Sequence, residues 1–121
     1  MPAPARIALE DEDGVTAVRF FDRHIMDDRI VREVGDQIMA ALPPSGPVRV
    51  ILDFGNVSMI SSAMIGRLVV LQRRADATGG LLRLCEVGTG VRDVLRTTNL
   101  DRIIKITRDR REAREAFGPV K

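Results

Sequence analysis

Residues 52–66 read Leu-Asp-Phe-Gly-Asn-Val-Ser-Met-Ile-Ser-Ser-Ala-Met-Ile-Gly, an apolar strand end followed by a short loop and the start of a helix. Residues 48–52 are β-branched and almost continuously apolar, which is typical of an interior strand covered on both faces. The serine pair Ser61-Ser62 follows the loop, and the apolar spacing after it predicts a helix from about residue 61 to residue 77. The stretch therefore predicts one strand–loop–helix unit at the centre of a sheet.

Two uses of Ser61 and Ser62 follow from their position at the start of that helix. A serine there commonly caps the helix by accepting a hydrogen bond from a backbone N–H two or three residues on. The unpaired N–H groups and the positive end of the helix dipole also favour an anion, so a phosphate on either hydroxyl would be electrostatically supported. The residues alone leave both uses open.

Strands come before this unit, with one helix between them. Residues 6–10 and 14–20 predict two strands joined by an acidic turn that ends in Asp13-Gly14, a typical hairpin signal. Asp27-Asp28 offers an N-cap for a helix whose apolar residues repeat every fourth position. The proline-rich segment 43–47 ends that helix, so the N-terminal part of the chain predicts a hairpin and a helix.

Strands and helices continue to alternate after the unit. Gly79-Gly80 ends the helix that starts at the serines, and Asn99 is suited to a left-handed cap at the end of a later one. The predicted elements are a strand at 81–85, a helix at 89–97, a short strand at 103–106 and a charged helix at about 108–117. We therefore predict an α/β fold in a single domain over residues 1–121, of which residues 1–5 form a flexible leader. Its mixed sheet has an antiparallel N-terminal hairpin followed by parallel βα units, packed with about four helices.

Composition excludes several classes of function. Nineteen basic and 17 acidic residues give a formal charge of only +2, and mixed charges along the C-terminal helix indicate a solvated face, so we predict no nucleic-acid partner. No apolar stretch is long enough to span a membrane, and the first residues lack the apolar region of a signal peptide, which predicts a cytoplasmic protein. The one cysteine, Cys85, lies in an apolar run and is expected to be buried.

The residues do not support catalysis, a metal or a cofactor. A serine hydrolase needs a base, but the one histidine, His24, lies in the connection after the first hairpin, and no Gly-x-Ser-x-Gly turn is present. One Cys and one His cannot make a zinc site. The segment Gly88-Thr89-Gly90 imitates the start of a dinucleotide fingerprint, but Asp93 replaces its third glycine. We predict a protein that is not an enzyme.

Residues 50–106 together resemble the STAS domain family of anti-sigma factor antagonists. The family's switch segment reads roughly Leu-Asp, a short loop, then Asp-Ser-Ser-Gly-Leu-Gly, and the matching runs here are 51–54 and 59–66. Residues 79–84 look like the family's next strand, while 91–95 and 99–104 look like its following helix and last strand. The resemblance implies a STAS-like fold.

The resemblance also implies a function in signal transduction and transcription regulation. Members are non-catalytic partners in a switch: the unphosphorylated protein binds an anti-sigma factor that is also a serine kinase of the GHKL type, and phosphorylation of a serine breaks the complex. That serine matches Ser61, with Ser62 beside it. The expected partner-docking loop consists of Asn56, Ser58, Met59, Ile60, Ala63 and Met64.

Two residues depart from the family pattern and keep alternatives open. Ile60 stands where the family usually has Asp, and Ala63 stands where it usually has Gly. Both changes make the loop more apolar, which suits a constitutive protein contact. The alternatives to a phosphorylated antagonist are a STAS scaffold and a module that senses a small ligand such as a nucleotide or lipid, neither of them phosphorylated.

Overall fold

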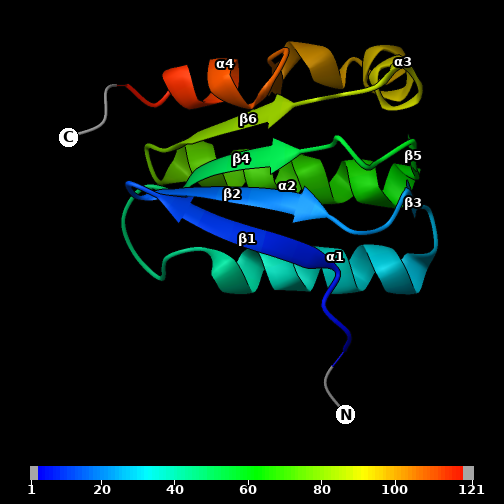
Figure 1. Cartoon of the computed structure of the whole chain (residues 1–121), viewed down its shortest axis with the longest axis horizontal. Helices are drawn as coiled ribbons and strands as arrows, with labels where there is room; N and C mark the ends of the chain where they lie inside the picture. The colour runs from blue at the N-terminus through cyan, green and yellow to red at the C-terminus, as the bar shows by residue number, and fades with distance from the viewer. Residues whose placement is uncertain (1–2, 119–121) are drawn as a thin grey trace.

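A five-stranded mixed sheet forms the centre of the computed structural model, which describes residues 3–118 (Figure 1). Its strands lie in the order β1-β2-β4-β6-β7, and a second, two-stranded sheet pairs β3 with β5. The elements are β1 (Ile7–Glu12), β2 (Val15–Phe20), β3 (His24–Ile25), α1 (Asp28–Ala41), β4 (Arg49–Asp53), β5 (Met59–Ile60), α2 (Ser62–Ala77), β6 (Leu81–Cys85), α3 (Thr89–Thr97), the 3-10 turn η1 (Leu100–Arg102), β7 (Lys105–Ile106) and α4 (Arg110–Glu115).

The topology confirms the predicted fold class. β1 and β2 pair antiparallel, whereas β2, β4, β6 and β7 run parallel to one another. The hairpin turns at Asp13 (φ 53°) and Gly14 (φ 83°), because a tight turn of this hand needs two residues with positive φ. Right-handed βα connections then place helices on the faces of the sheet.

Apolar side chains on the two faces of the sheet form two separate clusters. The larger cluster lies under α1, α2 and α3 and includes the fully buried Val50, Leu52 and Leu84. The smaller one lies under α4 and consists of Val15, Ala17, Ile51, Cys85, Ala113 and Phe117. Because β4 contributes to both clusters, it is covered on both faces, as its apolar sequence predicts.

The predicted capping residues are found at the helix ends. The carboxylate of Asp27 accepts hydrogen bonds from the N–H groups of Arg29 and Ile30 at the start of α1. Asn99, directly after α3, has φ 59° and adopts the predicted left-handed conformation. α1, α2 and α3 each start just after a parallel strand, so their N-termini gather at the end of the molecule where β3 and β5 lie (Figure 1).

Three short elements differ from the sequence-based prediction. β3 was not predicted, because a two-residue strand leaves no periodicity to detect. The last strand covers only Lys105–Ile106 rather than 103–106, since the N–H groups of Ile103 and Ile104 donate to the carbonyl of Leu100 and form a turn. α4 is shorter than the predicted 108–117, and it starts after Asp109, whose side chain accepts from the N–H of Glu112.

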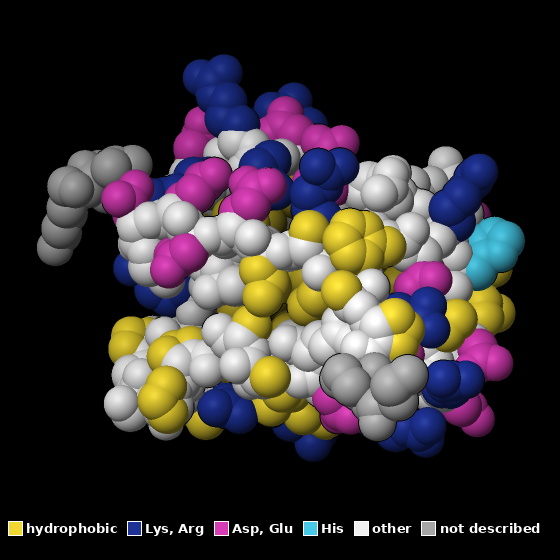
Figure 2. All heavy atoms as spheres, turned by 60° about the horizontal axis from the view of Figure 1, so that its bottom comes forward, with side chains coloured by type: hydrophobic (Ala, Val, Ile, Leu, Met, Phe, Trp, Pro, Cys, Tyr) yellow, Lys and Arg dark blue, Asp and Glu magenta, His cyan; other side chains and the backbone are white. Residues whose placement is uncertain are grey.

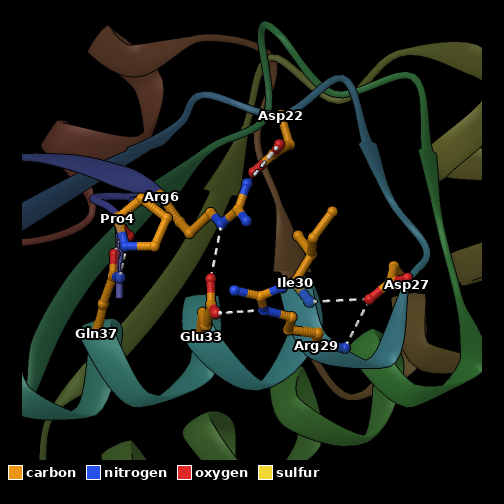
Figure 3. Close-up of polar contacts among 8 residues, drawn as sticks. All are labelled: Pro4, Arg6, Asp22, Asp27, Arg29, Ile30, Glu33 and Gln37. Carbon is orange, nitrogen blue, oxygen red and sulfur yellow. Dashed lines mark hydrogen bonds and ion pairs between the residues drawn. The ribbon is translucent and has the colours of Figure 1, made fainter. Parts of the chain in front are cut away.

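A polar network fixes the N-terminal segment to α1 (Figure 3). The guanidinium of Arg6 donates to Glu33 at 3.0 Å and to Asp22 at 3.2 Å, and Arg29 donates to the other oxygen of Glu33. The hydrogen bond from Arg6 is the main reason that the pKa of Glu33 lies below its ordinary value of 4.5. The network joins the start of β1 and the β2–β3 connection to the same helix.

α4 is attached to the first hairpin by ion pairs. Arg110 lies 3.6 Å from Glu10 and 3.5 Å from Asp53, and Arg114 lies 3.3 Å from Asp13. The contacts of Arg110 with Glu10 and of Arg114 with Asp13 join segments about a hundred residues apart in sequence. None of the helices formed by residues 3–118 has the length and apolar character needed to cross a membrane.

Candidate functional site

A tight turn after β4 begins the loop that leads to the two serines. The N–H of Phe54 donates to the carbonyl of Cys85 at 3.0 Å, and the N–H of Val57 donates to the carbonyl of Phe54 at 2.9 Å. The carboxylate of Asp53 accepts from the N–H of Gly55. The amide of Asn56 reaches the carbonyl of Phe20 at 3.2 Å, which ties the turn to the end of β2.

β3 and β5 hold the next part of the loop. His24 is opposite Met59 and Ile25 is opposite Ile60, and the N–H of Ser58 donates to the carbonyl of Arg23 at 2.7 Å. Ile25 and Ile60 both point into the core, and the N–H of Ser61 completes the ladder by donating to the carbonyl of Ile25. Backbone hydrogen bonds therefore fix the loop on both sides of Met59.

Ser61 is the N-cap of α2. Its backbone is extended, with φ −90° and ψ 169°, and its Oγ accepts from the N–H of Met64 at 3.3 Å. Ser62 is the first helical residue, and its side chain is exposed. The first turn of α2 contains no acidic residue, so the positive end of the helix dipole is not neutralised there. The capping role is thus observed for Ser61, while Ser62 lies exposed in the first turn of the helix.

The structure divides the predicted docking residues into exposed and buried ones. Asn56 and Ala63 are exposed, Met59 is 39% exposed and Ser58 is half-buried. Ile60 and Met64 do not lie on the surface: they are 3% and 0% exposed, because alternation along β5 and the inward face of α2 turn both side chains into the core. The surface of the loop is therefore formed by Met59 and Ala63 and not by Ile60 or Met64.

Sequence reasoning missed Gly90 as part of this site. Gly90 lies in the first turn of α3, and a Cβ built on it would come within 2.5 Å of the carbonyl oxygen of Ser58 and 3.1 Å of the Met59 sulfur. The start of α3 therefore packs directly on β5. The detectable signal was the pair Gly88 and Gly90 after the parallel strand β6, since parallel strands bring the loops at their carboxyl ends together.

Exposed apolar side chains from the β2–α1 connection extend this end of the molecule. Phe21 is 55% exposed and Met26 is 46% exposed, on either side of β3. Because His24 and Met59 are register partners and β-strand side chains alternate, both face outward from the two-stranded sheet. We call the exposed residues of this end the β5–α2 surface: Phe21, His24, Met26, Asn56, Met59, Ser62 and Ala63.

The geometry does not build a catalytic centre from the described residues. His24 forms no hydrogen bond with Ser61 or Ser62 in the part of the chain that the structure describes. Burial, together with the negative charge of Asp53, raises the pKa of the Cys85 thiol to about 12, so this thiol is not a nucleophile at neutral pH. No three metal-ligating side chains gather among residues 3–118. The arrangement is suited to contact with another protein.

Comparison with known proteins gives one family and one fold. The family model described as the STAS domain matches residues 7–113. A STAS domain protein of Planctomyces limnophilus, described as an anti-sigma-factor antagonist, is 24% identical, with a TM-score of 0.86 over 95% of this chain and 100% of that one. An anti-sigma factor antagonist candidate of Thermotoga maritima is also 24% identical, with a TM-score of 0.79 over 91% and 92% of the two chains.

A third solved structure is SpoIIAA, an anti-sigma factor antagonist described in its unphosphorylated form. It is 19% identical to this chain, with a TM-score of 0.73 over 95% of this chain and 99% of that one. At these identities the likeness to the three structures shows the fold.

Proposed function

This chain belongs to the STAS domain family, and we propose from that premise that it is a regulatory protein that binds an anti-sigma factor with serine kinase activity. Binding takes place in the cytoplasm through the β5–α2 surface, and phosphorylation of Ser61 ends it. Solved structures similar to this chain include described anti-sigma factor antagonists, which supports a regulatory role.

One observation carries the proposal: Ser61 stands at the start of α2, half-buried beside the exposed Met59 and Ala63. A phosphate on its Oγ would add nearly two negative charges at a helix N-terminus whose first turn has no acid to repel it. The modified protein would therefore keep its fold.

The same phosphate would act against a partner that covers the β5–α2 surface. Closing an interface over Met59 and Ala63 would remove water from the phosphate, and burying a charge without a matching partner is costly. An interface that fits the free hydroxyl would thus reject the phosphorylated form. Ser61 would work as a switch without any catalytic group on this chain.

Ile60 favours a second candidate, a STAS scaffold that binds its partner constitutively. The side chain that replaces the family's usual Asp is 3% exposed and packs in the core beside Ile25. No carboxylate of β5 is therefore available to position an approaching kinase. The exposed Phe21, Met26 and Met59 would then form a permanent contact.

Peptide mass mapping of residues 53–67 from protein purified out of its native cells separates the two candidates. We expect one phosphoryl group on Ser61, present in wild type and in Ser62→Ala and absent from Ser61→Ala. Partners that co-purify with wild type should be lost with Ser61→Asp and retained with Ser62→Ala. An unmodified segment in stressed and unstressed cells alike would contradict the switch and leave the scaffold.

A further inference from the structure

The outer edge of β1 offers unpaired backbone groups. β1 is the terminal strand of the sheet and bonds only to β2. Ile7 is opposite Phe20, and the pair before it, Arg6 and Phe21, is hydrogen-bonded, since the N–H of Phe21 donates to the carbonyl of Arg6. In an antiparallel ladder only every second residue bonds to its partner strand. Ile7, Leu9 and Asp11 therefore direct their N–H and C=O groups to the free side, where no other segment of residues 3–118 bonds to them.

A groove of about 410 Å³ runs along this edge between β1 and α1. Leu9 is half exposed in it, although most leucines of the chain are buried. Figure 2 turns this side of the molecule forward and shows hydrophobic side chains gathered in its middle, with charged groups above and below. The residues that line the groove are all uncharged: Ala3, Ala5, Ile7, Leu9, Gln37, Ala40 and Ala41.

Gln37 gives the groove a fixed wall. Its side-chain oxygen accepts from the N–H of Arg6 at 2.8 Å, and its amide nitrogen donates to the carbonyl of Pro4 at 2.8 Å (Figure 3). These two bonds hold the segment before β1 against α1, so the groove is formed before anything binds. A preformed groove lowers the entropy cost of binding.

An acidic residue stands at one end of this uncharged groove. Strand alternation places Asp11 on the same side of β1 as Ile7 and Leu9. The neighbouring acids Glu10 and Glu12 point to the other face, where they pair with arginines of α4. Asp11 is exposed and forms no ion pair with any of residues 3–118.

We propose that this groove binds an extended peptide segment of a partner protein, which adds to the free edge of β1 as a further strand. The segment has small or apolar residues at alternate positions to face Leu9 and Ala41, and a Lys or Arg to pair with Asp11. Ile7 to Asp11 span about 14 Å at about 3.4 Å per residue, enough for backbone bonds at three alternate residues. Strand addition between an edge strand and a helix is a recurrent mode of peptide recognition.

A peptide fits this edge better than a second copy of the chain. β1 reads Ile-Ala-Leu-Glu-Asp-Glu, so a second copy that offered its own β1 would bring three acids and no positive charge to Asp11. A peptide needs room for one strand only, about 4.8 Å from β1. This site is distinct from the β5–α2 surface and does not depend on Ser61.

Selection from a phage-displayed library of eight-residue peptides, on the whole chain, tests the proposal. We expect enriched peptides to alternate apolar and polar residues and to contain Lys or Arg. Binding of synthesised versions is measured by fluorescence anisotropy. Leu9→Pro should lower their affinity at least about tenfold, because proline removes a free N–H without breaking a bond to β2. Leu9→Lys, read with circular dichroism for folding, replaces Leu9→Pro if the latter does not fold.

Charge variants and oligomeric state complete the test. Asp11→Lys should shift enrichment from basic to acidic peptides, whereas Asp101→Lys, an exposed acid at the opposite edge of the sheet, should not. Ser61→Asp should leave peptide binding unchanged. The proposal is overturned if no peptide is enriched, if Leu9→Pro and Leu9→Lys bind enriched peptides as wild type does, or if sedimentation shows a dimer that Leu9→Lys abolishes.

Discussion

Gly90 lies so close to Ser58 that a methyl group in place of its hydrogen would come within 2.5 Å of the Ser58 carbonyl oxygen. The start of α3 thus sets the position of β5 and, through it, of Ser61. The loop that leads to Ser61 thus contacts a helix that follows it by about thirty residues in sequence.

Gly90→Ala should separate α3 from β5. Because the contacted atom is backbone oxygen, one element must shift, at a cost of about 1–3 kcal/mol in the free energy of unfolding. Urea unfolding measures that cost, and amide NMR spectra should show shifts at Ser58 and Met59. Gly66→Ala is the control: nothing lies within 4 Å of its Cβ, and alanine should stabilise the exposed face of α2 by up to about 1 kcal/mol. Equal effects of the two variants would contradict the close contact.

Met59 and Met64 should respond differently to the same truncation. Met64→Ala removes a fully buried side chain and should lower the free energy of unfolding by about 2–5 kcal/mol. Met59→Ala should change it by less than about 0.5–1 kcal/mol but weaken partner binding by about 1 kcal/mol or more. Chemical denaturation and titration calorimetry measure the two quantities. A partner that binds both folded variants as it binds wild type would not use the β5–α2 surface.

Ser61→Ala should cost about 1 kcal/mol of stability, because the N–H of Met64 loses its cap. Ser61→Asp keeps a capping oxygen and adds a charge that favours the helix N-terminus, so its stability should equal or exceed that of wild type. Ser62→Ala, at the next position, should be nearly neutral. Thermal unfolding ranks the three, and a Ser61→Asp variant less stable than Ser61→Ala would exclude the capping role.

Glu33 should make the free energy of unfolding fall as the pH is lowered into the acid range. Arg6 lowers the pKa of Glu33, so the native state binds this proton less readily than the unfolded state. The contribution is complete above the ordinary value of 4.5 and disappears as the pH falls through the lowered pKa. Urea midpoints between about pH 6 and about pH 3 should therefore fall less steeply in Glu33→Gln. Glu115→Gln, an exposed acid on α4, should keep the wild-type slope; identical slopes in all three proteins would contradict the linkage.

Cys85 should not react in the native protein. Burial raises the pKa of its thiol to about 12, so almost no thiolate exists near about pH 8. An aromatic disulfide reagent should modify the thiol only after urea unfolds the chain. Rapid modification without denaturant would show that the cluster under α4 opens easily.

The sequence predicts the sheet and its helices because those elements have strong local signals. Val50, Ile51 and Leu52 form a continuous apolar run, Asp27 caps a helix with regular apolar spacing, and Asp13-Gly14 specify one type of turn. These signals act within a few residues of each other. Predictions of fold class and most element positions were therefore confirmed.

Contacts between distant segments were not predictable in the same way. Nothing near His24 shows that it pairs with Met59, since β3 has two residues and its partner lies 35 positions later. The inward orientation of Ile60 follows from that pairing and could not be read from the loop alone. The contact of Gly90 with Ser58 likewise depends on how β6 lies beside β4.

The ion pairs between α4 and the first hairpin have a consequence for the way this chain is synthesised. Ala113 and Phe117, which cover Val15 and Ala17, leave the ribosome about a hundred residues after them. The nascent sheet can close its face under α1 and α2 while the opposite face is still bare. Chaperones that bind exposed apolar strands would therefore recognise that face until α4 has been translated and Arg110 and Arg114 have paired with Glu10 and Asp13 of the hairpin.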